Sequence, residues 1–376
     1  MSLFASKVLL FPYYTLLKLR NRAYDKGRRK VADYRSYGDK VISFGNIAMG
    51  GTGKTPHVEM FIRHFLEKGK TVAVVSRGYK RKTKEPLEVQ VDSSALEVGD
   101  EPLQIKRKFP QVRVFVDKKR EDTVETLINP PLGVPVDIIL LDDAHQYRRL
   151  IPGRSIVPID YSRPVFKDNL FPFGKLRDLP DQIKRADTVI ITRSPGWLDE
   201  WQKEKVRTAN HLNPSQRLYF TTVDYLKPLE VFEGADGRFI YSQECILFTG
   251  IADPIELHNF LTTKYAEIYE VKYPDHHLYK KGDIRALARL ARKHPAAVLL
   301  TTEKDAQRLR LIEDACKAIR TRLFYVPIET RLIEGESDLL LYESHNGVSR
   351  NPERQRRTVD TEAVESYRTD LFGNIE

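Results

Sequence analysis

The fold of this chain is decided by the stretch Val41-Ile-Ser-Phe-Gly-Asn-Ile-Ala-Met-Gly-Gly-Thr-Gly-Lys-Thr55. An apolar, β-type run leads into a glycine-rich loop that closes on Gly-Lys-Thr, and an amphipathic helical pattern follows. The backbone N–H groups of such a loop, together with a helix N-terminus, form a cradle for anionic phosphates. The order of strand, loop and helix therefore predicts an α/β domain of the P-loop NTPase type that binds a nucleoside triphosphate.

The residues of this loop have separate expected roles. Lys54 would reach the β- and γ-phosphates, and the Thr55 hydroxyl would bind Mg²⁺. The loop departs from G-x-x-x-x-G-K-[ST] at its first glycine position, where Ala48 stands. A glycine-rich turn without a ligand is the alternative, but the Gly-Lys-Thr ending argues against it. The expected nucleotide-binding residues are Ala48, Met49, Gly50, Gly51, Thr52, Gly53, Lys54 and Thr55.

Composition limits the class of protein. The chain has 376 residues, 41% of them hydrophobic and 30% charged, as expected for a globular protein of about two domains. Cys245 and Cys316 are far apart and form no C-x-x-C pair, which argues against a disulfide scaffold or structural zinc and suits a reducing cytoplasm. The net charge of +10 favours an anionic partner, such as nucleic acid, acidic lipid or a phosphorylated substrate.

Residues 1–30 combine an apolar run with a basic one. The uncharged run from Val8 to Leu17 is too short to span a bilayer, which needs about 20 residues. A signal peptide would carry its charge before the apolar run, and here the order is reversed. The pattern is typical of an amphipathic helix in a membrane interface, and a helix packed on its own domain is the alternative. The basic residues are Lys18, Arg20, Arg22, Lys26, Arg28, Arg29 and Lys30.

Short apolar runs recur along the chain, with helix-length segments between them. After the first run at 41–44 they lie at 71–75, 112–116, 136–141, 155–159, 188–192, 218–222, 245–249, 297–301 and 323–327. Continuous apolar strands separated by helices indicate parallel sheets covered on both faces. We therefore predict an α/β/α sandwich at 31–182, a second, smaller α/β domain at 183–340 and a polar tail at 341–376.

Two acidic elements are candidates for the chemistry. The apolar strand ending in Leu140-Leu141-Asp142-Asp143 looks like a Walker B element, whose carboxylate lies beside the phosphate loop and holds Mg²⁺ directly or through water. Asp100, within Gly99-Asp-Glu-Pro102, is the carboxylate best placed to orient and deprotonate an attacking hydroxyl. An ordinary turn or helix start is the alternative in both cases.

Two further motifs lie in the second half of the chain. Tyr273-Pro-Asp-His-His277 contains paired histidines, which could tune a nearby carboxylate or simply be satisfied by hydrogen bonds in a loop. Thr301-Thr-Glu-Lys-Asp305 differs from the guanine-reading N-K-x-D motif, because Lys304 and Asp305 are adjacent. We therefore expect ATP rather than GTP.

Nine short motifs follow one another in a characteristic order. They lie at 45–56, 76–79, 99–102, 142–150, 171–178, 185–187, 249–254, 275–277 and 302–305, with the sequences GNIAMGGTGKTP, SRGY, GDEP, DDAHQYRRL, FPFGKLRD, RAD, TGIADP, DHH and TEKD. In this order they resemble the lipid A disaccharide 4′-kinase (tetraacyldisaccharide 4′-kinase) family of Gram-negative bacteria, over residues 1 to about 330. Each motif alone is weak, whereas the ordered set is specific.

The resemblance implies two α/β domains with the active site in the cleft between them. It implies a peripheral enzyme on the cytoplasmic face of the inner membrane, which transfers the γ-phosphate of Mg·ATP to the 4′-hydroxyl of a tetraacylated glucosamine disaccharide 1-phosphate, late in lipid A biosynthesis. Such a substrate does not leave the bilayer readily, so residues 1–30 would bring the enzyme to anionic lipids at the membrane surface.

The resemblance also implies roles for individual residues. Asp100 would be the general base with His276 as its partner, and Lys54 would act as a catalytic cation. The implied metal neighbours are Thr55, Asp142 and Glu101. The implied substrate-positioning residues are Asp143, Tyr147, Arg177 and Asp178.

Two positions depart from the family's pattern. After the Walker B strand the family has D-D-G-F-Q-H-R or close to it, whereas this chain has tyrosine at 147 and histidine at 145. Whether Tyr147 or His145 replaces the family histidine stays open. Asp178 stands where glutamate is typical, so its reach is shorter by one methylene.

Two other functions compete with this one. A soluble P-loop kinase or ligase acting on a small polar substrate would leave the N-terminal segment unexplained. A nucleotide-switch protein that binds RNA should alternate basic residues with exposed aromatics or place them along a groove. The densest basic cluster here instead adjoins an apolar run. We therefore expect no nucleic-acid partner.

Overall fold

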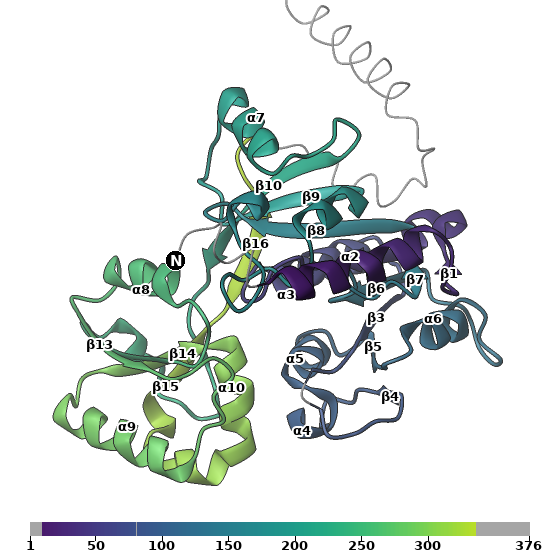
Figure 1. The fold of residues 1–376 in the computed structure, drawn as a ribbon. Helices are drawn as coiled ribbons and strands as arrows, with labels where there is room; N and C mark the ends of the chain where they lie inside the picture. The colour runs from purple at the N-terminus through teal and green to yellow at the C-terminus, as the bar shows by residue number, and fades with distance from the viewer. Residues whose placement is uncertain (1–9, 80, 336–376) are drawn as a thin grey trace, which may run out of the picture.

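Two sheets organise the computed structural model, which describes residues 10–79 and 81–335 (Figure 1). The larger sheet has nine strands, and the strands between its two edges are parallel. In spatial order they are β16 (Ile328–Leu332), β10 (Arg217–Tyr225), β9 (Thr188–Thr192), β8 (Arg154–Asp160), β2 (Val41–Phe44), β6 (Ile138–Asp142), β3 (Val72–Ser76), β5 (Arg113–Val116) and β4 (Leu87–Glu88). The predicted runs at 41–44, 71–75, 112–116, 136–141 and 155–159 are therefore strands of one sheet.

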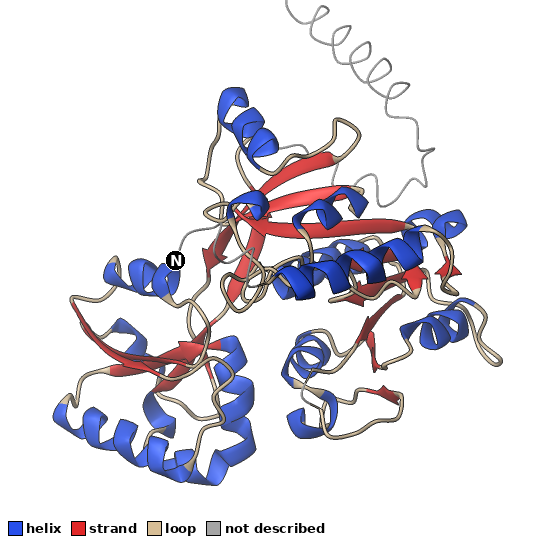
Figure 2. Cartoon of the chain, in the orientation of Figure 1, coloured by secondary structure: helices blue, strands red, loops and turns tan. Residues whose placement is uncertain are grey.

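The larger sheet is buried on both faces because alternate residues of its strands enter different cores. In β2, Ile42 and Phe44 pack with α3, whereas Val41 packs on the opposite face. Helices lie on both sides of the strands (Figure 2), as the predicted α/β/α sandwich requires. The helices of this unit are α2 (Phe11–Asp25), α3 (Lys54–Glu67), α4 (Ala95–Val98), α5 (Asp100–Lys108), α6 (Arg120–Ile128) and α7 (Glu200–Ala209).

The smaller sheet has five strands and forms the second α/β unit. Its order is β11 (Leu229–Glu230), β15 (Leu323–Val326), β14 (Val298–Thr302), β12 (Glu244–Thr249) and β13 (Glu267–Lys272), and β11 alone is antiparallel to its neighbour within this sheet. Its helices are α8 (Ile255–Thr262), α9 (Lys281–Lys293) and α10 (Glu303–Leu309). Figure 1 shows α10 on the side of this unit that faces α5 of the larger one.

Short elements complete the described chain. β1 (Ala32–Asp33) and β7 (Leu150–Ile151) form a separate parallel pair. The 3₁₀ helices are η1 (Arg35–Lys40), η2 (Val165–Lys167), η3 (Pro180–Arg185), η4 (Gly237–Tyr241), η5 (Arg310–Ala318) and η6 (Arg320–Arg322).

The domain boundary expected between residues 182 and 183 needs correction, because it falls inside the larger sheet. β9 pairs in parallel with β8, and β10 pairs with β9. The chain enters the smaller sheet only after β10 and returns through β16, which pairs with β10. Buried apolar runs look alike in either sheet, so the sequence could not assign 188–192 and 218–222 to the first unit. The tail expected at 341–376 lies outside the described residues.

Helix α2 presents two different faces. Leu17 and Asn21 are buried against the larger unit, while Phe11, Leu16 and Leu19 are 66%, 62% and 58% exposed. Residues 1–9 of the expected N-terminal helix lie outside the described part of the chain. Among the described helices, none combines the length and the apolar character that a bilayer-crossing segment requires.

Candidate active site

The phosphate loop joins β2 to α3 as predicted. Gly50 and Gly53 have φ of 87° and 80°, a left-handed conformation that a side chain would strain, so these glycines fit the turn. The Asn46 side chain accepts a hydrogen bond from the backbone N–H of Ala48 at 3.0 Å. The backbone N–H of Arg177 donates to the Ile47 carbonyl at 2.9 Å. This last contact brings the 171–178 segment against the loop.

Asp143 gathers two cations beside the phosphate loop. Its Oδ1 lies 2.6 Å from Lys54 Nζ, and its Oδ2 lies 3.0 Å from Arg177 Nη1. Burial alone would raise the pKa of Asp143, but the charges of Lys54 and Arg177 outweigh burial and hold that pKa well below its ordinary value. Asp143 is therefore ionised and holds both cations in place.

Asp142 fits the role of a metal neighbour. It ends β6 and pairs across the sheet with Phe44, the last residue of β2 before the loop. Its Oδ1 is buried and has no hydrogen-bond partner in the described chain. Burial, and next the nearby charge of Glu101, raise the pKa of Asp142 to about 6. A buried carboxylate oxygen without a partner is unfavourable unless a cation satisfies it.

The residues around Asp142 suit Mg²⁺ held jointly with a nucleotide. Thr55 is buried in the first turn of α3, the position from which the hydroxyl of a phosphate loop binds such an ion. Within residues 10–79 and 81–335, no three His, Cys, Asp or Glu side chains converge as a metal-binding group. Mg²⁺ usually takes one or two carboxylates from the protein and the rest of its ligands from phosphates and water, and the buried Asp142 carboxylate with the nearby Thr55 hydroxyl fits such a partial site.

Asp100 and Glu101 begin α5, where the helix N-terminus favours negative charge. Gly99, which precedes them, has φ of 95° and lies close to the Tyr79 carbonyl, so the sharp entry into this helix requires glycine. Glu101 Oε1 lies 2.5 Å from Lys304 Nζ, on α10 of the second unit. The charge of Lys304 is the main reason that the pKa of Glu101 is lowered.

Arg308 connects Asp100 to His276. Its side chain is 1% exposed, and it donates from Nε to Asp100 Oδ2 at 2.9 Å and from Nη2 to His276 Nδ1 at 3.2 Å. His276 Nδ1 itself is 3.9 Å from Asp100 Oδ2. Burial raises the pKa of Asp100, but the neighbouring His276 and the charge and hydrogen bond of Arg308 outweigh it, so the net shift is downward.

Comparisons with known proteins agree on one family. The family model for tetraacyldisaccharide-1-P 4′-kinase matches residues 5–343. The chain belongs to this family. A tetraacyldisaccharide 4′-kinase of Phocaeicola vulgatus is 35% identical over 333 residues, covering 87% of this chain and 90% of the relative. One from Porphyromonas gingivalis is 37% identical over 325 residues, covering 84% and 89%.

A solved structure adds the fold and the nucleotide. LpxK from Aquifex aeolicus, crystallised in complex with ATP, matches with a TM-score of 0.63 and 26% identity, over 90% of this chain and 98% of that one. The family membership makes this chain an ATP-using kinase of lipid A biosynthesis, as its motifs indicate.

In this 4′-kinase family member, the structure does not bring every expected residue into the cluster. The Tyr147 hydroxyl donates to Glu121, and its ring lies 4.4 Å from the guanidinium of Arg120. His145 is buried and its Nε2 is 3.1 Å from the Gln182 carbonyl. Burial, and next the charge of Arg185, lower the pKa of His145 to about 3, so it stays neutral. The Tyr147 hydroxyl is therefore engaged by Glu121, which argues against the substrate contact expected of it.

Asp178 also has a different environment from the one expected. It is fully buried, and its Oδ1 accepts hydrogen bonds from Asn21 on α2 at 2.9 Å and from the Leu179 backbone at 2.8 Å. A carboxylate buried in this way cannot touch a bound sugar. Asp178, the residue after Arg177, therefore links its segment to α2, and its burial argues against the direct substrate contact expected of it.

The sequence did not single out three residues that connect the parts of this kinase. Arg308 and Asn21 were not noticed, because neither belongs to a recognised motif. Arg120 donates to the carbonyls of both Asp142 and Asp143 at 3.0 Å, and so fixes the turn after β6. Arg308 lies three residues beyond the TEKD motif, and this position next to a recognised motif is the sequence signal that could have identified it.

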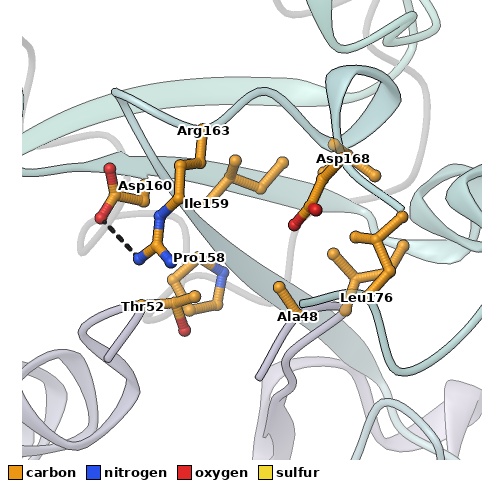
Figure 3. Close-up of a pocket in the computed structure, with 10 residues that line it drawn as sticks. Ala48, Thr52, Pro158, Ile159, Asp160, Arg163, Asp168 and Leu176 are labelled. Atoms are coloured by element: carbon orange, nitrogen blue, oxygen red, sulfur yellow. Dashed lines mark hydrogen bonds and ion pairs between the residues drawn. The ribbon is translucent and has the colours of Figure 1, made fainter. Parts of the chain in front are cut away.

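A small pocket is lined in part by the phosphate loop (Figure 3). Ala48 and Thr52 of the loop face Asp160, Arg163 and Asp168, and Arg163 pairs with Asp160 at 3.1 Å. Its volume is about 10 Å³, which suits a single water molecule. This pocket is therefore not the acceptor site of the kinase.

Proposed function

We propose that this kinase transfers the γ-phosphate of Mg·ATP to the 4′-hydroxyl of a tetraacylated glucosamine disaccharide 1-phosphate at the cytoplasmic face of the inner membrane. The observation that supports this reaction is that the starts of two helices lie near the Asp142–Asp143 turn: Lys54 of α3 pairs with Asp143, and Glu101, next to Asp100 on α5, lies close enough to Asp142 for their charges to interact. The first binds triphosphate and the second supplies a base, with the metal neighbour between them.

Asp100 accepts the proton of the attacking hydroxyl. The acceptor oxygen bonds to the γ-phosphorus, the bond from that phosphorus to the ADP oxygen breaks, and the hydroxyl proton passes to the Asp100 carboxylate. Arg308 can only donate, so His276 Nδ1 is the acceptor of their hydrogen bond and the proton of a neutral imidazole is on Nε2. Arg308 thus positions both members of the Asp100–His276 pair.

Lys54, Thr55, Asp142 and Glu101 hold the nucleotide and its ion. Thr55 and Asp142 would hold Mg²⁺ directly, with Glu101 beside them, and the ion when bound neutralises charge on the transferring phosphoryl group. Lys54 reaches the same phosphates from α3, where Asp143 orients it. The backbone N–H groups of residues 48–55 bind the remaining phosphate oxygens.

Helix α2 carries the membrane-facing role. Its exposed apolar residues Phe11, Leu16 and Leu19 lie beside basic residues, a combination that inserts into the headgroup region of an anionic bilayer. Arg177 follows the segment that pairs with the phosphate loop, and α2 is tied to its neighbour Asp178. The helix that meets the membrane is therefore joined to the residues proposed to position the phosphorylated sugar.

A phosphate-transfer assay tests the function. Wild-type protein is incubated with radiolabelled ATP, Mg²⁺ and the purified lipid acceptor, alongside Asp100→Asn. The variant should turn over about 10²–10⁴ times more slowly with little change in the KM for ATP, because it lacks only the base. Asp314→Asn, a change in a 94% exposed side chain, is the matched control and should behave as wild type. Lipid phosphorylation by Asp100→Asn at the wild-type rate would overturn the assignment of the base, and none by wild type would overturn the function.

A further inference from the structure

The TEKD motif forms the start of α10, and its lysine, Lys304, lies beside the proposed phosphoryl-transfer site. The Thr302 hydroxyl accepts a hydrogen bond from the Asp305 backbone and donates to Asp305 Oδ2 at 2.7 Å, which caps the helix. This cap fixes Lys304 in the first turn, on the side that faces α5. Helix α10 therefore carries this ammonium group out of the second unit and into the acidic N-terminus of α5.

Lys304 reaches the phosphate site as a charged group. Its Nζ lies 2.5 Å from Glu101 Oε1, and a third of its side chain is exposed. The charge of Lys304 also acts on Asp142, and Glu101 experiences the charge of Lys54 as well. Lys304 and Lys54 thus approach the same carboxylates from two different domains.

Three arginines near these carboxylates each donate two or more hydrogen bonds. Arg120 donates to two backbone carbonyls, Arg177 to both oxygens of Asp143, and Arg308 to Asp100, Asp305, His276 and the Gly250 carbonyl. The hydrogen bond described for Lys304 goes to Glu101, which is itself an expected neighbour of the metal. With Mg·ATP in place, Glu101 would lie beside the ion, and the ammonium of Lys304 would then be able to donate to a phosphate oxygen.

We propose that Lys304 is a catalytic lysine that the second domain contributes to the phosphoryl-transfer site. This proposal rests on the proposed function and names the group that completes its charge stabilisation. As the acceptor oxygen bonds to phosphorus and the bond to ADP breaks, negative charge spreads over the equatorial phosphoryl oxygens. Lys304 donates a hydrogen bond to one of them and keeps its own protons, while the hydroxyl proton goes to Asp100. It acts as a cationic finger supplied in cis.

A purely structural role is the competing explanation, because Lys304 also joins the two domains. The chain offers a matched control for that role in Lys108, which lies on the same helix α5 as Glu101. Its Nζ pairs with Glu303 of α10 at 3.3 Å and with Glu59 at 2.6 Å. Lys108 lies eight residues beyond Asp100, about 12 Å along the helix. It therefore joins the same domains at a distance from the phosphate loop.

The experiment compares Lys304→Met, Lys304→Arg and Lys108→Met in full-length protein. Initial rates with ATP and the lipid acceptor give kcat and the KM for ATP, and calorimetry gives the affinities for Mg·ADP and for Mg·ADP with aluminium fluoride. Lys304→Met should lose about 10³-fold or more in kcat, as removal of a cationic finger does, with a KM for ATP within about threefold of wild type. It should bind Mg·ADP normally and lose the tighter binding that aluminium fluoride adds. Lys304→Arg should recover part of both.

Three results would overturn the proposal. They are a kcat for Lys304→Met within tenfold of wild type, an equal loss in Lys108→Met, or undiminished binding of the aluminium fluoride complex by Lys304→Met. Urea unfolding of each variant establishes that it is folded, and Lys304→Arg provides the comparison if the methionine variant is not. The aluminium fluoride measurement needs no lipid, so a failure of the lipid assignment in wild type would be distinguished from a failure at Lys304.

Discussion

The hydrogen bond between Asn21 and Asp178 joins helix α2 to the rest of the kinase, and removing it tests how that helix is held. Asn21 is 2% exposed, and its Nδ2 donates to Asp178 Oδ1 at 2.9 Å. Asp178 Oδ2 is buried without a partner in the described chain, so Asn21→Ala would leave this carboxylate with the Leu179 backbone N–H as its one described donor. A hydrogen bond to a charged group contributes about 1.5–3 kcal/mol.

This loss translates into a measurable change in helix docking. About 2 kcal/mol corresponds to a shift of roughly 30-fold in the ratio of docked to undocked α2. The side chain of Leu17, the Arg20–Gln146 contact and the Arg148–Asp25 pair remain, so the helix should open more often without detaching permanently. Amide hydrogen exchange within 11–25 should therefore accelerate by up to about 30-fold in Asn21→Ala.

A second variant on the same helix separates docking from membrane binding. Leu16 is 62% exposed, and burying a leucine side chain in an apolar environment contributes about 1.5–3 kcal/mol. Leu16→Ala should leave hydrogen exchange in water unchanged and weaken binding to anionic vesicles by about tenfold. Exchange rates in Asn21→Ala within twofold of wild type would refute the docking argument. Vesicle binding by Leu16→Ala at wild-type strength would refute the membrane-facing assignment.

Three further predictions concern the body of the kinase. Lys54→Met should lower kcat by about 10²–10³-fold and also raise the KM for ATP, and steady-state rates within tenfold of wild type would contradict its role. Tyr147→Phe removes only the hydroxyl that donates to Glu121, so the free energy of unfolding should fall by about 1 kcal/mol. The KM for the lipid should stay within threefold of wild type, and a tenfold rise in that KM would indicate that Tyr147 contacts the substrate. Burial lowers the pKa of His57 to about 4, so the unfolded state binds more protons and stability should fall as pH drops from 6.5 toward 4. The loss of unfolding free energy between pH 7 and pH 5 should be about 2 kcal/mol, measured by urea unfolding, and should be smaller in His57→Gln. An unchanged loss in that variant would assign the pH dependence to other titratable groups.

The inner strands could be predicted because burial on both faces makes them continuous apolar runs. β13 and β16 could not, since both are edge strands in which charged residues alternate with apolar ones, as in Glu267–Lys272. The domain boundary was misplaced for a different reason. A strand's partner is set by packing over long distances, and the run at 188–192 contains nothing that distinguishes one sheet from the other.

The candidate site also has one part that local sequence could predict and one part that it could not. The phosphate loop and the Walker B strand are local motifs, so their chemistry can be read from a few consecutive residues. Arg308 bonds to Asp100 across 208 positions of sequence, and Asn21 bonds to Asp178 across 157. Tyr147 and Asp178 carry suitable groups at expected positions, yet each finds a partner within the protein. Partner choice of this kind depends on the assembled fold.

The surroundings of Asp100 constrain how the transfer proceeds. Despite burial, the neighbouring His276 and the charge and hydrogen bond of Arg308 lower the pKa of Asp100, so this proposed base is ionised at neutral pH but weak. A weak base is adequate if the hydroxyl loses its proton late in the reaction. In a loose, metaphosphate-like transition state the acceptor oxygen forms little bond to phosphorus, so it does not need to be strongly nucleophilic. Catalysis then depends on where the reacting groups are held and on the cations around the phosphoryl oxygens. The buried Arg308 therefore has two opposite effects on the proposed reaction: it fixes the position of Asp100, and it weakens Asp100 as a base. The first effect outweighs the second.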